Sequence, residues 1–130
     1  MLPVPIPVPA IPTGNETYSQ ATRLGDFLFV SGQLGIDPAT GQLVTGGAVA
    51  EYQQALDNLR VILESAGSSL AHVAKTTIYM TDMSLLPELN AVYARYFPHR
   101  PAKTGVEVRG LAGGAAIEIE AVAGVADLLR

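Results

Sequence analysis

The spacing of apolar residues changes along this chain, and that change limits most strongly what it can fold into. Between Val49 and Ala66 apolar residues recur three and four positions apart, which forms one stripe on an α-helix. Gly67 follows and favours a helix end. In the segment 116–125 apolar residues instead alternate with glutamates, which is the period of a β-strand with two different faces. The chain therefore combines helices with strands.

Two strands are predicted near the start of the folded part. The run Phe27–Val30 consists of strand-forming apolar residues, and the segment 17–24 precedes it. The Gly25-Asp26 pair between them favours a hairpin turn. Proline, threonine and glycine predict a loop over 37–43.

A second strand and helix follow the first helix. β-branched residues predict a strand over 72–82, and Ser84 is a favourable N-cap for a helix that ends at Pro98. The segment 104–109 alternates as a strand, and a glycine-rich turn joins it to the closing strand. The order β-β-α-β-α-β-β predicts an α+β fold, with one mixed sheet covered on one face by both helices.

The N-terminal residues 1–13 form a separate proline-rich arm, and 14–130 form the single domain. Alternating prolines in "MLPVPIPVPAIP" predict an extended, polyproline-like segment that packs on the surface or frays. This arm lacks the basic region and helix-forming core of a signal peptide, and no stretch is apolar enough to cross a membrane. We therefore expect a cytoplasmic protein with no membrane partner.

The composition excludes several classes of function. A net charge of -4 with only 8 lysines and arginines does not suit nucleic-acid binding. The absence of cysteine excludes disulfides, a thiol nucleophile and cysteine-based zinc sites, and two histidines do not make a usual metal site. No phosphate-binding, dinucleotide or serine-hydrolase motif occurs. Hydrophobic residues reach 48%, which suggests that other subunits cover part of the surface.

Few residues remain that could carry chemistry. Lys103 lies directly before the strand 104–109, carboxylates lie on the two closing strands, and polar residues surround Ser31. A cation, a carboxylate and backbone donors can bind a small anion and position a water molecule. Charges that are only solvated on the outer face of a sheet would give the same sequence pattern. The residues alone leave both interpretations open.

Several motifs together resemble one family of proteins. They are "YSQAT" at 18–22, "FVSGQLGIDPATGQL" at 29–43, "QALDNLRVILESAGSSLAHVAKTTIYMTDM" at 54–83, "NAVYARYF" at 90–97, "RPAKTGVEV" at 100–108 and "IEIEAVA" at 117–123. In combination they are similar to the RidA/YjgF family of reactive-imine deaminases, also labelled endoribonuclease L-PSP-like. The resemblance covers nearly all of 14–125 and leaves out the proline-rich arm.

The resemblance implies a fold, an assembly and an activity. The fold is chorismate-mutase-like, in a homotrimer whose sheets form a central barrel with sites in clefts between subunits. The activity is hydrolysis of 2-imino or enamine acids, such as 2-iminopropanoate and 2-iminobutanoate, to the 2-oxo acid and ammonia. No metal or organic cofactor is needed.

The resemblance also implies roles for individual residues. In the family an arginine grips the substrate carboxylate at the position of Lys103, and a glutamate at the position of Glu118 orients the hydrolytic water. The remaining substrate-binding positions match Tyr18, which lines the cleft, Ser31 and Gly32, which give a backbone contact, and the supporting positions Asn90 and Gly105.

Three departures from the family pattern concern the site. Lys103 replaces an arginine, and an ammonium holds a carboxylate with less orientation than the planar fork of a guanidinium. Arg100, three residues upstream, is an alternative ligand for the carboxylate. Gly105 stands where the family often has cysteine or threonine, and "GNETYSQA" replaces the usual Gly-Pro before the tyrosine.

These departures keep other functions open. A trimer that binds a small carboxylate without turnover, or a chaperone-like holdase, fits a drifted site. A third hypothesis makes Lys103 an amine nucleophile that forms a Schiff base, which needs a lowered lysine pKa. The ribonuclease role in one family label conflicts with the acidic charge and the absence of a histidine pair.

Overall fold

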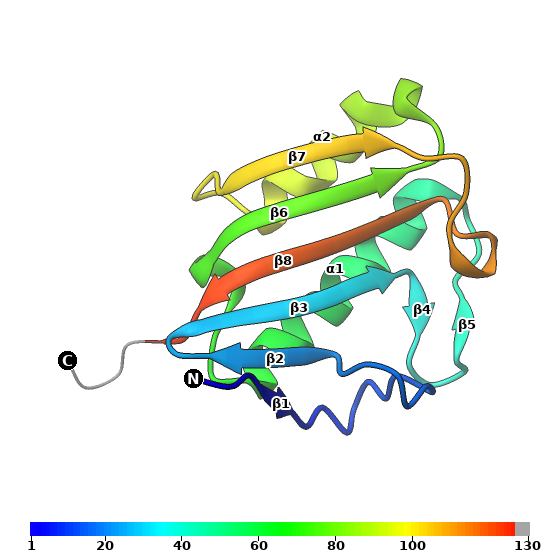
Figure 1. The fold of residues 1–130 in the computed structure, drawn as a ribbon. Coiled ribbons are helices and arrows are strands. Elements are labelled where there is room, and N and C mark those ends of the chain that lie inside the picture. Colours follow the sequence, from blue (N-terminus) through cyan, green and yellow to red (C-terminus); the bar gives the residue numbers. More distant parts are fainter. Residues whose placement is uncertain (127–130) are drawn as a thin grey trace.

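The sheet has six strands in the order β1-β2-β3-β8-β6-β7 (Figure 1). We describe residues 1–126 from a computed structural model. The strands of this sheet are Val4–Ile6 (β1), Ala21–Leu24 (β2), Phe27–Leu34 (β3), Val73–Met80 (β6), Ala102–Glu107 (β7) and Ile117–Gly124 (β8). A second, two-stranded sheet consists of Ile36–Asp37 (β4) and Gln42–Leu43 (β5).

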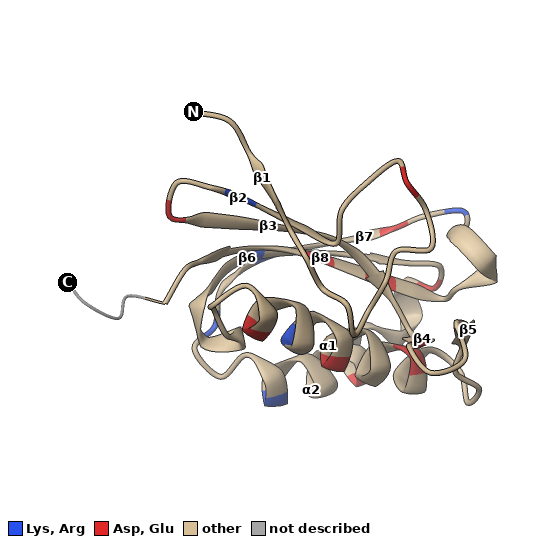
Figure 2. Ribbon diagram, turned by 90° about the horizontal axis from the view of Figure 1, so that it is seen from below, with Lys and Arg blue, Asp and Glu red and all other residues tan. Residues whose placement is uncertain are grey.

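Two α-helices, Ala48–Ser65 (α1) and Leu86–Tyr96 (α2), pack on the same side of the large sheet (Figure 2). Short 3₁₀ turns at Leu70–His72, Met83–Leu85 and Ala112–Gly114 join the larger elements. Strands β6 and β7 are parallel because α2 connects them, and the other strand pairs are antiparallel. The predicted mixed sheet with both helices on one face is confirmed. No helix within residues 1–126 has the length and apolar character to span a membrane.

The core lies between the sheet and the two helices. In β8 the alternate residues Ile117, Ile119, Ala121 and Ala123 are buried toward the helices, as their spacing predicts. The helices contribute a buried set that includes Tyr52, Leu56, Leu59, Ile62, Leu63 and Phe97. Glu118 and Glu120 therefore lie on the opposite face of the sheet, which no helix covers.

That open face carries exposed apolar side chains. Leu28 and Val30 of β3 are buried toward the helices, so Phe27 and Phe29, which alternate with them, point to the open face. Phe27 is 56% exposed and Phe29 is 43% exposed. Large exposed aromatic side chains on one face are typical of a surface that meets another protein.

The proline-rich arm is joined to the sheet. Val4–Ile6 pairs with β2 as an edge strand, the position in a sheet where proline is tolerated. Val8 and Ile11 then enter the core, where they are 8% and 7% exposed. The side chain of Gln20 donates a hydrogen bond to the Ile11 carbonyl at 3.1 Å. Three interactions thus hold the arm: the pairing of β1 with β2, the burial of its apolar side chains, and the hydrogen bond from Gln20.

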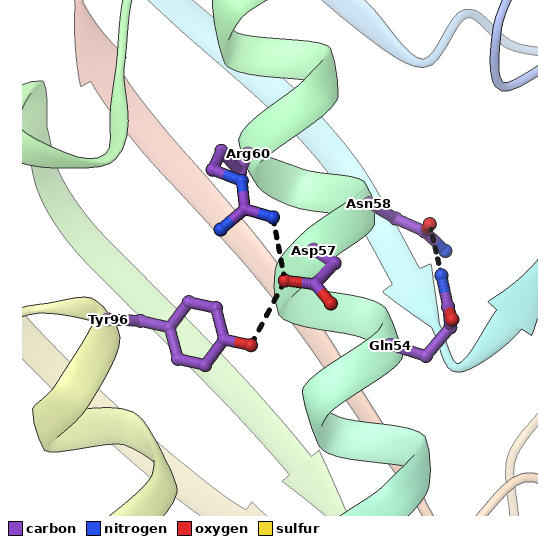
Figure 3. A network of polar contacts seen from close by, with 5 residues as sticks. All are labelled: Gln54, Asp57, Asn58, Arg60 and Tyr96. Atoms are coloured by element: carbon purple, nitrogen blue, oxygen red, sulfur yellow. Dashed lines mark hydrogen bonds and ion pairs between the residues drawn. The ribbon is translucent and has the colours of Figure 1, made fainter.

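Helix α1 agrees with its sequence pattern to within one residue at each end. A polar contact joins it to α2, because the Tyr96 hydroxyl donates to Asp57, which also pairs with Arg60 at 3.0 Å (Figure 3). At the C-terminus Gly67 has a φ of 77°, and Ser68 N–H donates to the Leu63 carbonyl. These are the features of a glycine-terminated helix.

The predicted N-cap of the second helix is wrong. Ser84 lies inside a 3₁₀ turn that precedes α2, and Leu85 occupies the N-cap position. The cap of that turn is Asp82, whose carboxylate accepts hydrogen bonds from the backbone N–H and the hydroxyl of Ser84. Asp82 satisfies the role expected of Ser84 because a carboxylate accepts from the free N–H groups at a helix start. These hydrogen bonds hold the pKa of Asp82 below its usual value.

Candidate active site

A pocket of about 210 Å³ lies beside the carboxylate of Glu118. Tyr18, Gly32 and Glu118, three of the residues predicted for the site, line it together. They come from the loop before β2, from β3 and from β8. The fold thus brings one group of predicted site residues to a single concave surface.

Gly32 lies directly against Glu118. A Cβ atom at Gly32 would lie only 2.7 Å from the Glu118 Cδ atom, so only glycine leaves the carboxylate in this position. The pairing between β3 and β8 is irregular between Val30 and Gln33. An irregularity of this kind leaves backbone groups without their partners in the neighbouring strand and changes the direction in which they point. The backbone at Ser31–Gly32 is therefore presented to the pocket.

The buried amide of Gln33 and the half-buried amide of Gln20 hold this irregular segment in place. The Gln33 side chain donates to Gln20 Oε1 at 2.8 Å and to the Ser31 carbonyl at 3.1 Å. Ser31 N–H donates to the Gln20 carbonyl, and the Ser31 hydroxyl donates to the Ser19 carbonyl at 2.7 Å. Gln33 is 4% exposed, so breaking its hydrogen bonds would leave polar groups without partners in the interior.

Helix α1 supports the same pocket from the other side. Asn58 donates to the Ile36 carbonyl at 2.8 Å and accepts from Gln54 (Figure 3). Glu51, which is 8% exposed, accepts a hydrogen bond from Ala116 N–H at 2.8 Å, just before β8 begins. These contacts fix the chain on both sides of Glu118.

The carboxyl group of Glu118 is shifted toward its protonated form. Partial burial raises its pKa, and the nearby charge of Glu120 raises it further. Glu120 itself accepts a hydrogen bond from the Tyr79 hydroxyl. A carboxylate with a raised pKa is a stronger base, which suits proton transfer to and from water.

The second group of predicted residues lies on β7 and α2. The Lys103 ammonium donates to Asn90 Oδ1 at 2.6 Å and lies 5.1 Å from the centre of the Tyr93 ring. Tyr93 is fixed from behind by a buried hydrogen bond of 2.7 Å between its hydroxyl and Thr76. An amide oxygen and an aromatic face thus orient the ammonium.

The charge of Lys103 stays available to a ligand. Its partner Asn90 is neutral, and within residues 1–126 the recorded ion pairs do not include Lys103. An ammonium has three N–H donors, so two remain after the bond to Asn90. Partial burial lowers the pKa of Lys103. Arg100 is exposed in the turn before β7, where its φ is 59° and its backbone N–H donates to Phe97.

Gly105 lies two residues beyond Lys103, on the same side of β7. The nearest atom to a Cβ placed there is the flexible Met80 Cε, at 3.3 Å. The surface beside the ammonium is therefore bare backbone. Glu107, the next residue on this side, accepts from Met83 N–H and plays no part in either group.

The two groups do not meet within one chain. Strand β6 separates β8 from β7, which places them roughly 10 Å apart across the sheet. Lys103 pairs with Thr76, which is buried toward the helices, whereas Glu118 lies on the open face. A single small acid cannot contact Lys103 and Glu118 of the same subunit.

Several residues at this site were not predicted from the sequence. Ile11, Pro12 and Thr13 of the arm line the pocket, although the arm was assigned to the surface. Tyr93 is a further site residue that the sequence analysis does not name. Its three-residue spacing from Asn90, which puts both on one side of α2, is the signal that could have revealed it.

The family model described as Endoribonuclease L-PSP matches residues 10–125 of the chain. A RutC family protein of Pyrococcus horikoshii is 48% identical over 107 residues, which are 82% of this chain and 85% of that protein. A mouse protein named 2-iminobutanoate/2-iminopropanoate deaminase is 42% identical over 113 residues, 86% of this chain and 84% of its own length. A Yersinia pestis crystal structure, of the conserved Rid protein family, matches with a TM-score of 0.91 at 36% identity, covering 95% of this chain and all of that one.

Proposed function

The chain belongs to the RidA/YjgF family of endoribonuclease L-PSP-like proteins, and from that premise we propose that it is a deaminase of reactive 2-imino acids. The reaction adds water to the C=N carbon of a 2-imino acid and releases the 2-oxo acid and ammonia. The observation that carries the proposal is the carboxylate of Glu118 beside a pocket, against the bare backbone of Gly32.

Glu118 acts as the base and then as the acid. Its carboxylate accepts a proton from a water molecule while the water oxygen bonds to the imine carbon. The same carboxyl donates that proton to the nitrogen, which gives a carbinolamine. It then takes the proton of the new hydroxyl and passes it to the nitrogen while the C=O bond forms and the C–N bond breaks, so that ammonia leaves. The raised pKa of Glu118 serves both steps, because a group that accepts and returns one proton works best near the operating pH.

Lys103 binds the carboxylate of the substrate through the two N–H groups that Asn90 leaves free. Asn90 and Tyr93 restrict the ammonium to one place, which compensates in part for the missing planar fork of arginine. The neutral partner Asn90 leaves the full positive charge for the ligand.

The complete site takes Glu118 from one subunit and Lys103 from its neighbour in a homotrimer. Two considerations support this assembly. The proposed reaction needs both residues at one small acid, yet they lie on opposite faces of a single chain. The open face also carries the exposed Phe27 and Phe29, which a neighbouring subunit would cover.

An assay of imine hydrolysis tests the proposal. An amino-acid oxidase generates 2-iminobutanoate, semicarbazide traps the imine that escapes, and the 2-oxo acid is measured with and without the protein. We expect the wild-type protein to reduce trapping and Glu118→Gln to abolish this effect. If an added small carboxylic acid raises the melting temperature of the protein but no imine is hydrolysed, the result would support instead a non-catalytic carboxylate-binding trimer.

A further inference from the structure

The proline-rich arm builds part of the wall of the Glu118 pocket. Ile11 and Pro12 of the arm line it together with Leu34, Ile36 and Pro38. Among the described residues 1–126, Glu118 is the only charged residue that lines the pocket. The pocket thus combines one ionisable group with several apolar side chains.

The amide N–H groups of Gln33 and Asn58, the two buried polar side chains of the lining, are already engaged. Gln33 uses both of its N–H groups on Gln20 and Ser31, and Asn58 uses both of its own on the Leu34 and Ile36 carbonyls. Gln20 donates to Ile11. A polar substrate group that entered the wall would lose water and find these N–H donors occupied. The wall therefore favours an apolar occupant.

The arm is fixed at the pocket, which makes its side chains a permanent wall. Ile11 is 7% exposed and is held by Gln20, and the following turn is closed by hydrogen bonds among Thr13, Asn15 and Thr17. The volume of about 210 Å³ equals the space of about seven water molecules. That room exceeds what a methyl group needs.

We infer that this wall, with Ile11 and Pro12 as specificity residues, selects 2-imino acids whose side chains are apolar and larger than methyl. The inference rests on the proposed imine hydrolysis. The imine carbon lies at Glu118, the substrate carboxylate faces the lysine, and the side chain extends toward the arm. The arm thereby takes part in choosing the substrate.

Three imines compared in the oxidase and semicarbazide assay test this inference. Leucine and glutamine give side chains of similar length and different polarity, and alanine gives a methyl group. We expect kcat/KM for the leucine-derived imine to exceed that for the glutamine-derived imine about tenfold or more, because the amide would lose its hydrogen bonds. We expect a similar excess over the alanine-derived imine. Equal values for all three would overturn the inference and leave the hydrolysis itself intact.

Variants of the arm identify the wall directly. Ile11→Ala should reduce the preference for the leucine-derived over the alanine-derived imine about tenfold. Pro12→Asp, at an exposed position that needs no core repacking, should reduce it too. The control is Val4→Ala, because Val4 is in the same arm, 58% exposed and outside the pocket. An unchanged preference in both pocket variants would contradict the assignment.

A binding measurement separates this inference from the proposed function. 4-Methyl-2-oxopentanoate and 2-oxopropanoate have the side chains of the leucine and alanine products. We expect the larger acid to raise the melting temperature more, and Ile11→Ala to remove the difference. If no imine is hydrolysed but this difference is found, the pocket assignment stands and the hydrolysis fails. Equal shifts from the two acids would overturn the assignment.

Discussion

The two halves of the candidate site are supported in different ways. The Glu118 half is surrounded by buried amides and helix contacts, with Gln33 at 4% and Asn58 at 3% exposure. The Lys103 half lies on the edge strand β7, whose residues are mostly exposed. A base that must aim a water molecule needs a fixed position, whereas a charge that attracts a carboxylate acts over a longer range. The support of each half matches the precision that its task requires.

The largest effect is expected at the buried half. Glu118→Gln should lower kcat about 10²- to 10⁴-fold, because the amide cannot accept and return a proton. We expect the Glu118→Gln variant to fold as the wild type does. A raised folded-state pKa means that the stability contributed by Glu118 is present below its unfolded pKa and is lost as pH rises through its folded pKa.

Melting curves check the sign of that argument. Glu118→Gln should melt slightly above the wild type at pH values above the folded-state pKa of Glu118, where the wild-type carboxyl is charged. The difference should vanish below its unfolded-state pKa, where the carboxyl is protonated. A variant that melts well below the wild type at neutral pH would show that Glu118 is a structural residue.

The edge half should respond mainly in substrate affinity. Lys103→Met keeps the apolar stem and removes the charge, so kcat/KM should fall about 100-fold, mostly through KM. Arg95→Met is the matched control, because Arg95 is an exposed cation on α2 with no place in the site. A loss confined to kcat would argue against carboxylate binding and in favour of lysine acting as an amine.

A single methyl group tests how tightly the buried half is fitted. Gly32→Ala places a Cβ 2.7 Å from the Glu118 Cδ atom, so the carboxylate must move. We expect kcat to fall about tenfold to 100-fold at nearly unchanged melting temperature. Gly110→Ala is the control, because nothing lies within 4 Å of a Cβ there. Equal kinetics in both variants would mean that the contact between Gly32 and Glu118 is irrelevant.

The smallest expected effect is a shift in the pH dependence of kcat/KM. This shift distinguishes the Glu118 half of the site from the Lys103 half. The profile of kcat/KM should fall on the acidic side through a Glu118 pKa above its usual value, and on the alkaline side through a Lys103 pKa below its usual value. Lys103→Arg should move only the alkaline limb upward, because a guanidinium stays protonated. If Lys103→Arg leaves the alkaline limb unchanged, that limb does not report the pKa of Lys103.

The sequence predicted the individual helices and strands better than the contacts between them. Periodicity gave α1, the faces of β8 and the sheet with its helices, because burial on one face repeats along an element. It did not show that Lys103 and Glu118 face opposite sides, since that depends on the order and register of strands far apart in the chain. The role of the arm was missed because the cavity beside Ile11 exists only after the chain has folded.

The central claim is that one site is assembled from two chains. Glu118→Gln and Lys103→Met, each with at most about a hundredth of wild-type activity alone, should be mixed, unfolded and refolded together. Random assembly of cyclic trimers leaves about a quarter of the sites with both residues intact, so about a quarter of wild-type activity should return. Mixed oligomers that form, as shown by two different affinity tags, and yet recover no activity would contradict the account.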